Sequence, residues 1–380
     1  MQASHTREWF MLVALALIWA FFAWQQPVFL SARNLSLLSI ELAVTATLAL
    51  GMLLVLLPGH IDLSAGSGVG LAGAVAAVLV TWHGVPAPVA LLLAAVAAVL
   101  IWGLMGALVI VERVPAFIIT LGGLLVFRGL HWLVIENSTV PVVAGGSQNL
   151  YSMLTTSFLP PAAGYVLGAL AIVVLVGASQ RRRAARQRVG LPVADRERHI
   201  MGLLIAAQVI ALAVVVANGY RGLPLALVIL AAVALLVHIV IRHTSFGRYL
   251  YAIGGNEEAA VVSGVPVRGA VIGAFALMGL IVALTGFMQT AYSGASTTTI
   301  GSLMELDAIA ACVIGGTSLR GGRGSVTGVL FGALIMASLL NGMTLMAVSP
   351  EIKYIARGAV LALAVWLDLR VARVHREALA

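Results

Sequence analysis

Residues 305–325, ELDAIAACVIGGTSLRGGRGS, interrupt a chain that is otherwise composed largely of long apolar runs. Two carboxylates open this stretch, the only cysteine of the chain lies inside it, and glycine pairs and arginines close it. The residues AIAACVIGG between Asp307 and the polar end of the stretch are too few to cross a bilayer as a helix. Short segments interrupted by glycine usually line a cavity in membrane proteins, so we interpret 306–319 as a half-crossing segment.

The composition places the whole chain in a membrane. Of the 380 residues, 61% are hydrophobic and 9% are charged, whereas about a quarter of the residues of a soluble domain are charged. The mean hydropathy is +1.08. We therefore expect an all-α polytopic membrane protein, with 1–380 as a single transmembrane domain. The first apolar run lacks a small-residue cleavage site followed by a polar mature domain, and we expect it to be a retained span.

Twelve apolar runs are candidate spans, and their order can be tested against the distribution of arginine. The runs lie at about 9–30, 37–57, 62–82, 87–111, 115–135, 161–179, 200–217, 223–241, 269–290, 306–319, 324–346 and 353–369. A cytoplasmic N-terminus puts nearly all arginines in cytoplasmic loops, above all in the Arg-rich loop 180–199. This agrees with the positive-inside rule, so we expect both termini in the cytoplasm. The outer loops 136–158 and 291–302 suit either docking of a soluble partner or plain solvation.

Several function classes are excluded by the same residues. The net charge of +8 does not indicate nucleic-acid binding, because the arginines lie at the ends of apolar runs and Lys353 is the only lysine. That lysine does not stand in a P-loop, so the chain has no Walker site. The GxGxxG match at 68–73 lies inside a span and favours close helix packing over dinucleotide binding. A single cysteine excludes an internal disulfide and a cysteine-based metal cluster, and we expect no metal site.

Four carboxylates lie within or beside the predicted spans, where an ionisable group is costly and each is a functional candidate. Asp62, in PGHIDLSAGSG (58–68), caps a helix N-terminus or faces a pathway. For Glu41 a structural and a pore-lining role fit equally. Glu305 and Asp307 are two residues apart and point in different directions on a helix, which favours charges at a helix start over a catalytic pair. An ion-coupled secondary transporter that uses these carboxylates is the alternative function.

The polar segment 242–265 separates two spans and is too long for a turn. Asn256 is a good N-cap, Glu257 and Glu258 suit a first helical turn, and Gly264 is a good stop. A short interfacial helix here either carries force from a cytoplasmic partner or is an ordinary surface helix. The local pattern does not separate these two interpretations.

A family resemblance separates them. The segments FGRYLYAIGGNEEAAVVSGV (246–265), ELDAIAACVIGGTSLRGGRGSVTG (305–328) and LALAVWLD (361–368) resemble the membrane subunit of bacterial ABC sugar importers, the ribose/xylose/arabinose/galactose permease family. GHIDLSAGSG (59–68) and VPAFIITLGGLLVFRG (114–129) are similar to the N-terminal signatures of this family. The ribose-type core has ten spans, and the extra helix pair at about 161–218 is similar to the xylose branch.

The resemblance implies a permease in the bacterial inner membrane, formed by two copies around a pathway for a monosaccharide, most closely xylose or a related pentose. It implies a periplasmic or lipid-anchored sugar-binding protein outside and a cytoplasmic ATPase that holds ATP and Mg, with no enzyme activity or cofactor on this chain. The coupling loop is then 242–268, with Gly255, Asn256, Glu257, Glu258 and Gly264 as coupling residues. The expected pathway residues are Asp62, Ser64, Glu305, Asp307, Gly315 and Gly316. The role of Glu41 stays open.

Overall fold

A computed structural model describes residues 2–143, 148–191, 193 and 196–377 of the chain. The helices are α1 (Gln2–Gln25), α2 (Ala32–Leu56), α3 (Ala65–Thr81), α4 (Ala87–Val111), α5 (Ala116–Val134), α6 (Leu150–Thr156), α7 (Pro161–Arg188), α8 (Arg196–Asn218), α9 (Leu225–His243), α10 (Ser245–Gly255), α11 (Glu257–Val262), α12 (Val267–Ser293), α13 (Met304–Ile314), α14 (Val326–Leu345) and α15 (Pro350–Glu377), with a 3-10 turn η1 (Pro27–Leu30). The strands β1 (Val140–Pro141), β2 (Phe158–Leu159), β3 (Leu223–Pro224) and β4 (Ala295–Ser296) are only two residues long.

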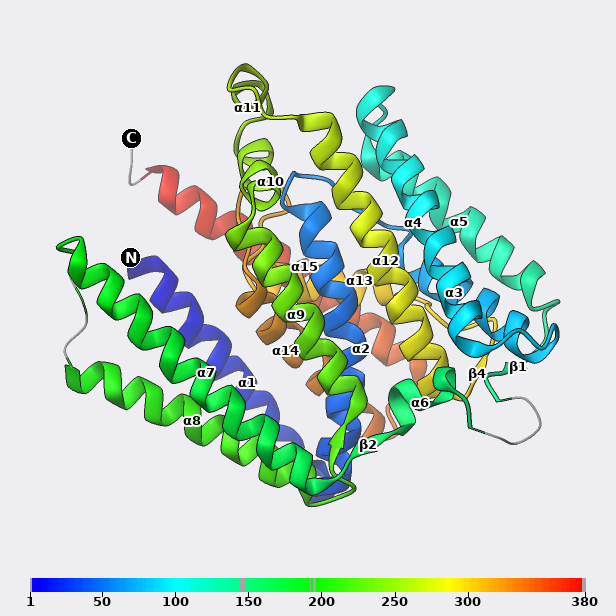
Figure 1. The fold of residues 1–380 in the computed structure, drawn as a ribbon, viewed down its shortest axis with the longest axis horizontal. Coiled ribbons are helices and arrows are strands. Elements are labelled where there is room, and N and C mark those ends of the chain that lie inside the picture. The colour runs from blue at the N-terminus through cyan, green and yellow to red at the C-terminus, as the bar shows by residue number, and fades with distance from the viewer. Residues whose placement is uncertain (1, 144–147, 192, 194–195, 378–380) are drawn as a thin grey trace.

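The helical, multi-pass architecture predicted from composition is confirmed (Figure 1). Within the described residues, eight helices are long and apolar enough to cross a membrane, namely α2, α4, α5, α7, α8, α9, α12 and α14. Each of the twelve apolar runs contains a helix, and α4 has the predicted bounds. Proline stands directly before α4, α5, α9 and α12, where its missing N–H is not needed and its fixed φ favours the first turn. The count of twelve crossings and the side of the termini stay predictions.

The helices divide into a buried centre and an exposed periphery. The apolar stretch of α2 is 78% buried and those of α12 and α14 are 67% buried, whereas the values for α7 and α8 are 11% and 6%. In the centre, α12 contacts α2, α3 and α4, and the short α13 packs against α2 and α14. The pair α7–α8 lies at the edge of the molecule in Figure 1, on the side where α1 begins. The centre therefore holds the buried polar groups that a membrane protein needs for function.

Glycines on α3 allow the close approach that the sequence predicts. A Cβ atom at Gly70 would lie 2.6 Å from the Ile300 carbonyl, and one at Gly73 would lie 2.8 Å from the Gly286 carbonyl of α12. Helix backbones meet at such positions because no side chain separates them. The interpretation of the GxGxxG match as a packing motif is confirmed.

The Arg-rich segment differs from its prediction. The loop expected at 180–199 is helical as far as Arg188, where α7 ends, and helix resumes at Arg196, while 192 and 194–195 lie outside the described residues. Arginine, alanine and glutamine are strong helix formers, so they extend α7 beyond its apolar part. Its 28 residues make a helix of about 42 Å, longer than the hydrocarbon core of roughly 30 Å. Arginines of the last turns therefore extend past the apolar stretch.

The outer loops also carry structure that the sequence did not reveal. The loop 136–158 contains β1 and α6, and the loop 291–302 contains β4, while 144–147 lie outside the described residues. The strands β1 and β4 pair in antiparallel register, with Val140 opposite Ser296 and Pro141 opposite Ala295. Phe158 likewise pairs with Pro224 across β2 and β3. These short ladders tie distant outer segments together.

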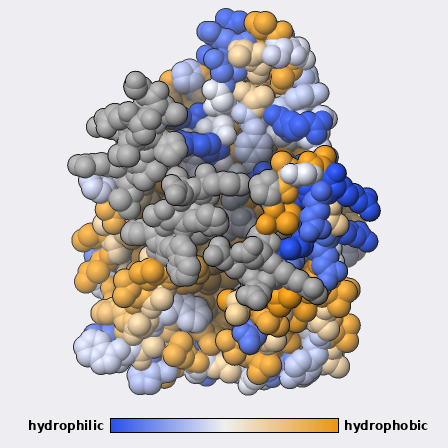
Figure 2. All heavy atoms as spheres, turned by 90° about the vertical axis from the view of Figure 1, so that its left-hand side faces the viewer, coloured by the Kyte–Doolittle hydropathy of each residue, from blue (hydrophilic) through white to orange (hydrophobic). Residues whose placement is uncertain are grey.

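The surface shows the polarity expected of a membrane protein. Figure 2 shows one face of the molecule, with hydrophilic residues at the top and along the right-hand side and hydrophobic residues over much of the lower part. Large apolar side chains such as Leu17, Leu100 and Leu133 are more than 60% exposed in the chain alone. Exposed apolar surface on this scale fits contact with lipid.

Candidate functional site

The carboxylates of the opening stretch lie at the start of a short buried helix. Leu303 has a left-handed backbone (φ 62°), and α13 follows with Glu305 and Asp307 in its first turn. This confirms the predicted helix-start position of both groups. The 11 residues of α13 span about 16 Å, roughly half of the hydrocarbon core. The helix ends at Ile314, with Gly315 as its C-cap, rather than at 319, because Gly316 has φ +98° and turns the chain out of the helix.

The two carboxylates face different cavities, as their spacing predicts. Glu305 lines a cavity of about 30 Å³ together with Arg128 and His131. That volume has room for about one or two water molecules. Asp307 instead lines a cavity of about 360 Å³, which lies in the range of small-molecule sites, about 300–1,000 Å³. We refer to the second one as the polar cavity.

Five central helices and the turn before α13 form the polar cavity. Its lining is mostly polar, with an aliphatic part from Ile300, Met304, Ala337 and Leu340. The polar lining residues are Glu41 and Thr45 on α2, Gln289, Tyr292 and Ser293 on α12, Thr299 and Ser302 before α13, Asp307 on α13, Thr344 on α14 and Arg357 on α15. Hydrogen-bond donors, acceptors and two signs of charge thus converge on one space.

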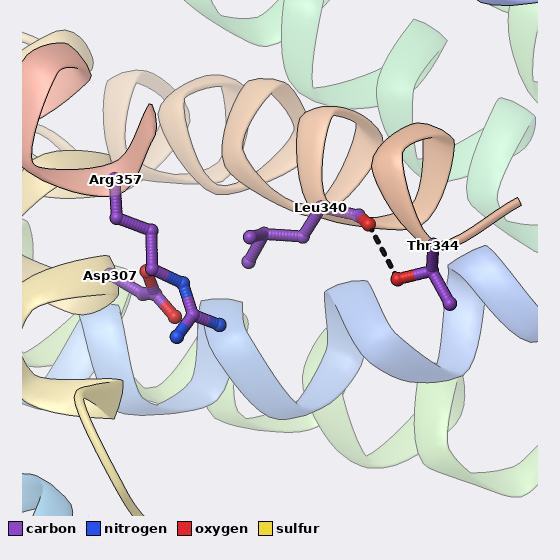
Figure 3. Close-up of polar contacts among 4 residues, drawn as sticks. All are labelled: Asp307, Leu340, Thr344 and Arg357. Carbon is purple, nitrogen blue, oxygen red and sulfur yellow. Dashed lines mark hydrogen bonds and ion pairs between the residues drawn. The ribbon is translucent and has the colours of Figure 1, made fainter. Parts of the chain in front are cut away.

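A buried ion pair crosses this cavity between α13 and α15. Arg357 Nε lies 3.2 Å from Asp307 Oδ1, and the two side chains are 21% and 7% exposed. Figure 3 shows the guanidinium beside the carboxylate, with Leu340 and Thr344 of α14 nearby. Both atoms nevertheless lack a hydrogen bond of good geometry within the described residues. Charge therefore balances here, but hydrogen-bonding capacity is left over.

A second carboxylate is held firmly in the same cavity. The Tyr292 hydroxyl donates to Glu41 Oε1 at 3.0 Å, and Asn341 Nδ2 donates to Oε2 at 3.1 Å. Asn341 Oδ1 in turn accepts from Asn34 Nδ2 at 2.9 Å, and Asn34 also donates to the Phe29 carbonyl. This buried chain of amides joins α2, α14 and η1 and fixes the orientation of Glu41. Glu41 is therefore a cavity-lining residue.

Asp62 and Ser64 lie at the start of α3, away from the polar cavity. Asp62 is fully buried, and its Oδ1 accepts from the backbone N–H of Ser64 at 2.8 Å and from the hydroxyl of Ser64 at 2.6 Å. Its other oxygen accepts from Trp102 Nε1 at 2.6 Å. The carboxylate thus ties the turn before α3 to α4. The N-cap of α3 is Ser64, whose side chain makes no capping hydrogen bond, so Asp62 supports the turn into the helix without capping it. A pathway role for Asp62 and Ser64 stays a prediction.

The inner end of α13 is packed backbone against backbone. A Cβ atom at Gly315 would overlap the carbonyl of Gly328 on α14. Cys312 is fully buried, and its thiol donates to the Ala49 carbonyl at 3.2 Å, so it acts as a small packing residue. Gly315 and Gly316 form this tight end, and their pathway role stays a prediction.

The segment 242–268, which we expect to be cytoplasmic, contains two short helices, α10 and α11, instead of one. The Asn256 side chain caps α11 by accepting from the Ala259 N–H at 2.9 Å, and Glu257 and Glu258 lie in its first turn. Gly264 follows the helix with φ +77°, a conformation that favours glycine. The predicted cap, first turn and stop are confirmed. The preceding α10, which ends at Gly255, was not predicted.

This segment is joined to the turn that follows α13. The Tyr251 hydroxyl on α10 donates to the Gly324 carbonyl at 2.8 Å, and the Gly322 N–H donates to the Leu57 carbonyl at 2.9 Å. A Cβ atom at Gly254 would overlap the same Leu57 carbonyl. A continuous path of contacts therefore runs from α10 through the turn 315–325 to α13.

Sequence reasoning missed Arg357 and Tyr292 as cavity residues, and Asn341 as a hydrogen-bond donor to Glu41. Arg357 carried a usable signal, because it is an arginine inside a predicted span, where ionisable groups are candidates. Tyr292 and Asn341 carried little signal in the sequence, because Glu41, to which both donate a hydrogen bond, lies more than 200 residues away in the chain. Among the described residues, no group of three or more His, Cys, Asp or Glu side chains could hold a metal ion.

Comparisons with known proteins place the chain in a family. The model of the permease component of the branched-chain amino acid transport system matches residues 34–365. The chain belongs to this permease family. It is 42% identical to the xylose transport system permease protein XylH of Escherichia coli K12 over 94% of this chain and 90% of the relative. For the protein of the same name from Haemophilus influenzae, identity is 40% over 97% of both chains.

A more distant relative is the ribose import permease protein RbsC of Escherichia coli K12, which is 33% identical over 96% of this chain and 95% of the relative. No solved structure matches the chain significantly. With its apolar helices and this family membership, the chain is a multi-pass protein of the bacterial inner membrane.

Proposed function

We propose that this chain is the membrane permease of an ATP-driven importer that moves xylose, or a related pentose, into the cytoplasm. The observation that carries the proposal is the similarity to xylose permeases over nearly the full length of both chains. The polar cavity supports it, because a neutral polyol needs hydrogen-bonding groups and no net charge. The permease then works by alternating access around this central region.

We assign ATP hydrolysis to a partner subunit, which would hold ATP and Mg, and no enzyme activity to this chain. The absence of a Walker motif from the sequence supports this assignment. The segment 242–268 couples the two subunits, with Gly255, Asn256, Glu257, Glu258 and Gly264 as the contact region. In Figure 1, α10 and α11 project at one end of the molecule, which suits contact with a soluble subunit.

We propose two further partners. A sugar-binding protein docks on the outer segments that β1, β4 and α6 organise, because the pairing of Val140 with Ser296 holds two outer loops as one surface. A second copy of the chain completes the transport unit. A dimer would be visible as doubled mass in native mass spectrometry of the complex, and a monomeric permease in an active complex would contradict it.

The charges of the cavity favour this importer over an ion-coupled transporter. Asp307 is neutralised by Arg357, and both oxygens of Glu41 accept hydrogen bonds, from Tyr292 and Asn341. A proton- or cation-binding site would need an acidic group without a fixed countercharge. Asp307 therefore acts as a cavity wall rather than as a carrier of a coupling ion.

The test is reconstitution in proteoliposomes with the ATPase and the binding protein. Xylose uptake should require all three components and ATP inside the liposomes, and it should persist in the presence of an uncoupler. Uptake by the permease alone that collapses with an uncoupler would overturn the proposal and favour the secondary transporter.

A further inference from the structure

We infer that the polar cavity is a sugar-binding site of the permease itself, in which Asp307, Arg357 and Glu41 bind sugar hydroxyl groups. This inference rests on the proposed function and deepens it, because a permease can also be a passive conduit with selectivity left to its binding protein. The ligand class is a neutral polyhydroxylated ring, such as an aldopentose.

The first support is the ion pair between α13 and α15, which leaves hydrogen-bonding capacity unused. Asp307 is only 5% exposed, yet its Oδ1 has no hydrogen-bond partner within the described residues, and the same holds for Arg357 Nε. Both side chains line the polar cavity. These two atoms have almost no accessible surface of their own, so a ligand in the cavity would bind through the other carboxylate oxygen of Asp307 and the terminal guanidinium nitrogens of Arg357, which are the remaining hydrogen-bonding groups of two side chains that line it.

The second support is Glu41, which lines the same cavity from α2. Tyr292 and Asn341 each donate one hydrogen bond to a different oxygen of this carboxylate. A carboxylate has about four acceptor positions, so about two of them stay open. Because the amide chain through Asn341 and Asn34 fixes the group, its open positions are presented in a defined geometry.

The chemistry of these groups matches a sugar. A hydroxyl group both donates and accepts, so adjacent hydroxyls can donate to a carboxylate and accept from a guanidinium. Ile300, Met304 and Leu340 give the same cavity an aliphatic part for the C–H edges of a ring. Asp307 and Arg357 balance each other's charge, and Glu41 adds an acceptor that suits the hydroxyl groups of a sugar and disfavours an anionic ligand.

Size assigns the ligand to this cavity rather than to its neighbour. The space beside Glu305, about 30 Å³, has room only for water, whereas the polar cavity of about 360 Å³ is within the range for a small ligand. Its affinity must be low, because a transported solute has to leave as readily as it enters.

The experiment uses two readouts on the same variants. Saturation-transfer NMR with D-xylose on the purified permease in nanodiscs detects weak binding without partners. The second readout is the ratio of xylose imported to ATP hydrolysed in the complete proteoliposome system. This ratio falls when the binding protein releases its sugar but the permease does not retain it. The variants are Asp307→Asn, Glu41→Gln and Gln289→Met, the last of which changes a lining residue outside the ion pair and so carries little folding risk.

The control is Ser36→Ala on α2, since Ser36 is buried with an unpartnered hydroxyl but does not line the cavity. We expect the saturation-transfer signal and the import ratio to fall at least threefold in the three variants and to stay unchanged in Ser36→Ala. Variants with the size-exclusion profile of the wild type but unchanged values in both readouts would overturn the inference, while ATP-dependent uptake by the wild type would still support the proposed function. Absence of that uptake would instead contradict the proposed function.

Discussion

The two ends of α13 are built in opposite ways. At its start, Asp307 faces a cavity of about 360 Å³ lined by side chains that can change rotamer. At its end, Gly315 meets the backbone of Gly328 with no side chain between them. One end can adapt to a ligand, whereas the other can only move together with its neighbour. A helix with this asymmetry can pass a rigid displacement from the inner turn to the walls of the cavity.

The largest effect is expected from one methyl group added at the tight end of α13. Gly328→Ala places a Cβ atom against the Gly315 carbonyl. We expect the free energy of unfolding to fall by about 1–3 kcal/mol, because the backbone contact must open. Gly122→Ala on α5 is the matched control, since no atom lies within 4 Å of its Cβ position, and helix propensity should make it neutral or stabilising by up to about 1 kcal/mol. The apparent melting temperatures of the purified variants measure both effects on stability. Equal melting temperatures for the two variants would show that the contact between Gly315 and Gly328 has room for a methyl group.

A second variant tests whether the coupling segment acts on this end. Tyr251→Phe removes the hydrogen bond to the Gly324 carbonyl, which is worth about 0.5–1.5 kcal/mol. We expect the import-to-hydrolysis ratio to fall about 2- to 10-fold while the fold is kept. Tyr249→Phe is the control, because the Tyr249 hydroxyl makes no hydrogen bond within the described residues. A ratio that falls equally in both variants would contradict a specific role for Tyr251.

A charge reversal on the surface of the coupling segment should have a smaller effect on uptake. Glu257 lies exposed in the first turn of α11, so Glu257→Lys loses about 0.3–1 kcal/mol of interaction with the helix dipole. We expect uptake to fall severalfold while basal ATP hydrolysis and membrane insertion persist, because the contact with the ATPase changes charge. Glu112→Lys, at the end of α4, should leave uptake unchanged. Uptake at the wild-type level in Glu257→Lys would remove this segment from the contact region.

The smallest effect is expected far from α13. Arg186 and Arg188 lie in the exposed last turn of α7, and Arg186→Gln should change stability by no more than about 0.5 kcal/mol. Uptake should equal that of the wild type. A loss of uptake on this substitution would show that the peripheral helix pair α7–α8 takes part in transport.

The sequence was sufficient for features that depend on local pattern. The apolar runs located a helix each, the spacing of Glu305 and Asp307 predicted their divergence, and Asn256 with Gly264 marked the ends of α11. Hydrophobic length, side-chain direction on a helix and capping all act over a few residues. The extension of α7 to Arg188 was missed because charge indicates a loop in a membrane protein even where helix propensity is high.

The polar cavity could not be predicted from one sequence. Glu41 and Asn341 are 300 residues apart, and Asp307 meets Arg357 only because α13 and α15 pack together. Such contacts depend on how all the helices are arranged. The outer strands were missed for the same reason, since a ladder of two residues has no pattern of its own and forms only when β1 and β4 are brought together.

The burial of Cys312 has a practical consequence for chemical mapping. It is the only cysteine of the chain, and it lies in the packed interior with no exposed surface. A water-soluble maleimide therefore has no native target while the protein is folded. Single cysteines introduced along α12, α13 or α15 can be labelled from either side of the membrane without first mutating the natural one. The rate of labelling at each position would then trace which wall of the permease is open to water during each stage of transport.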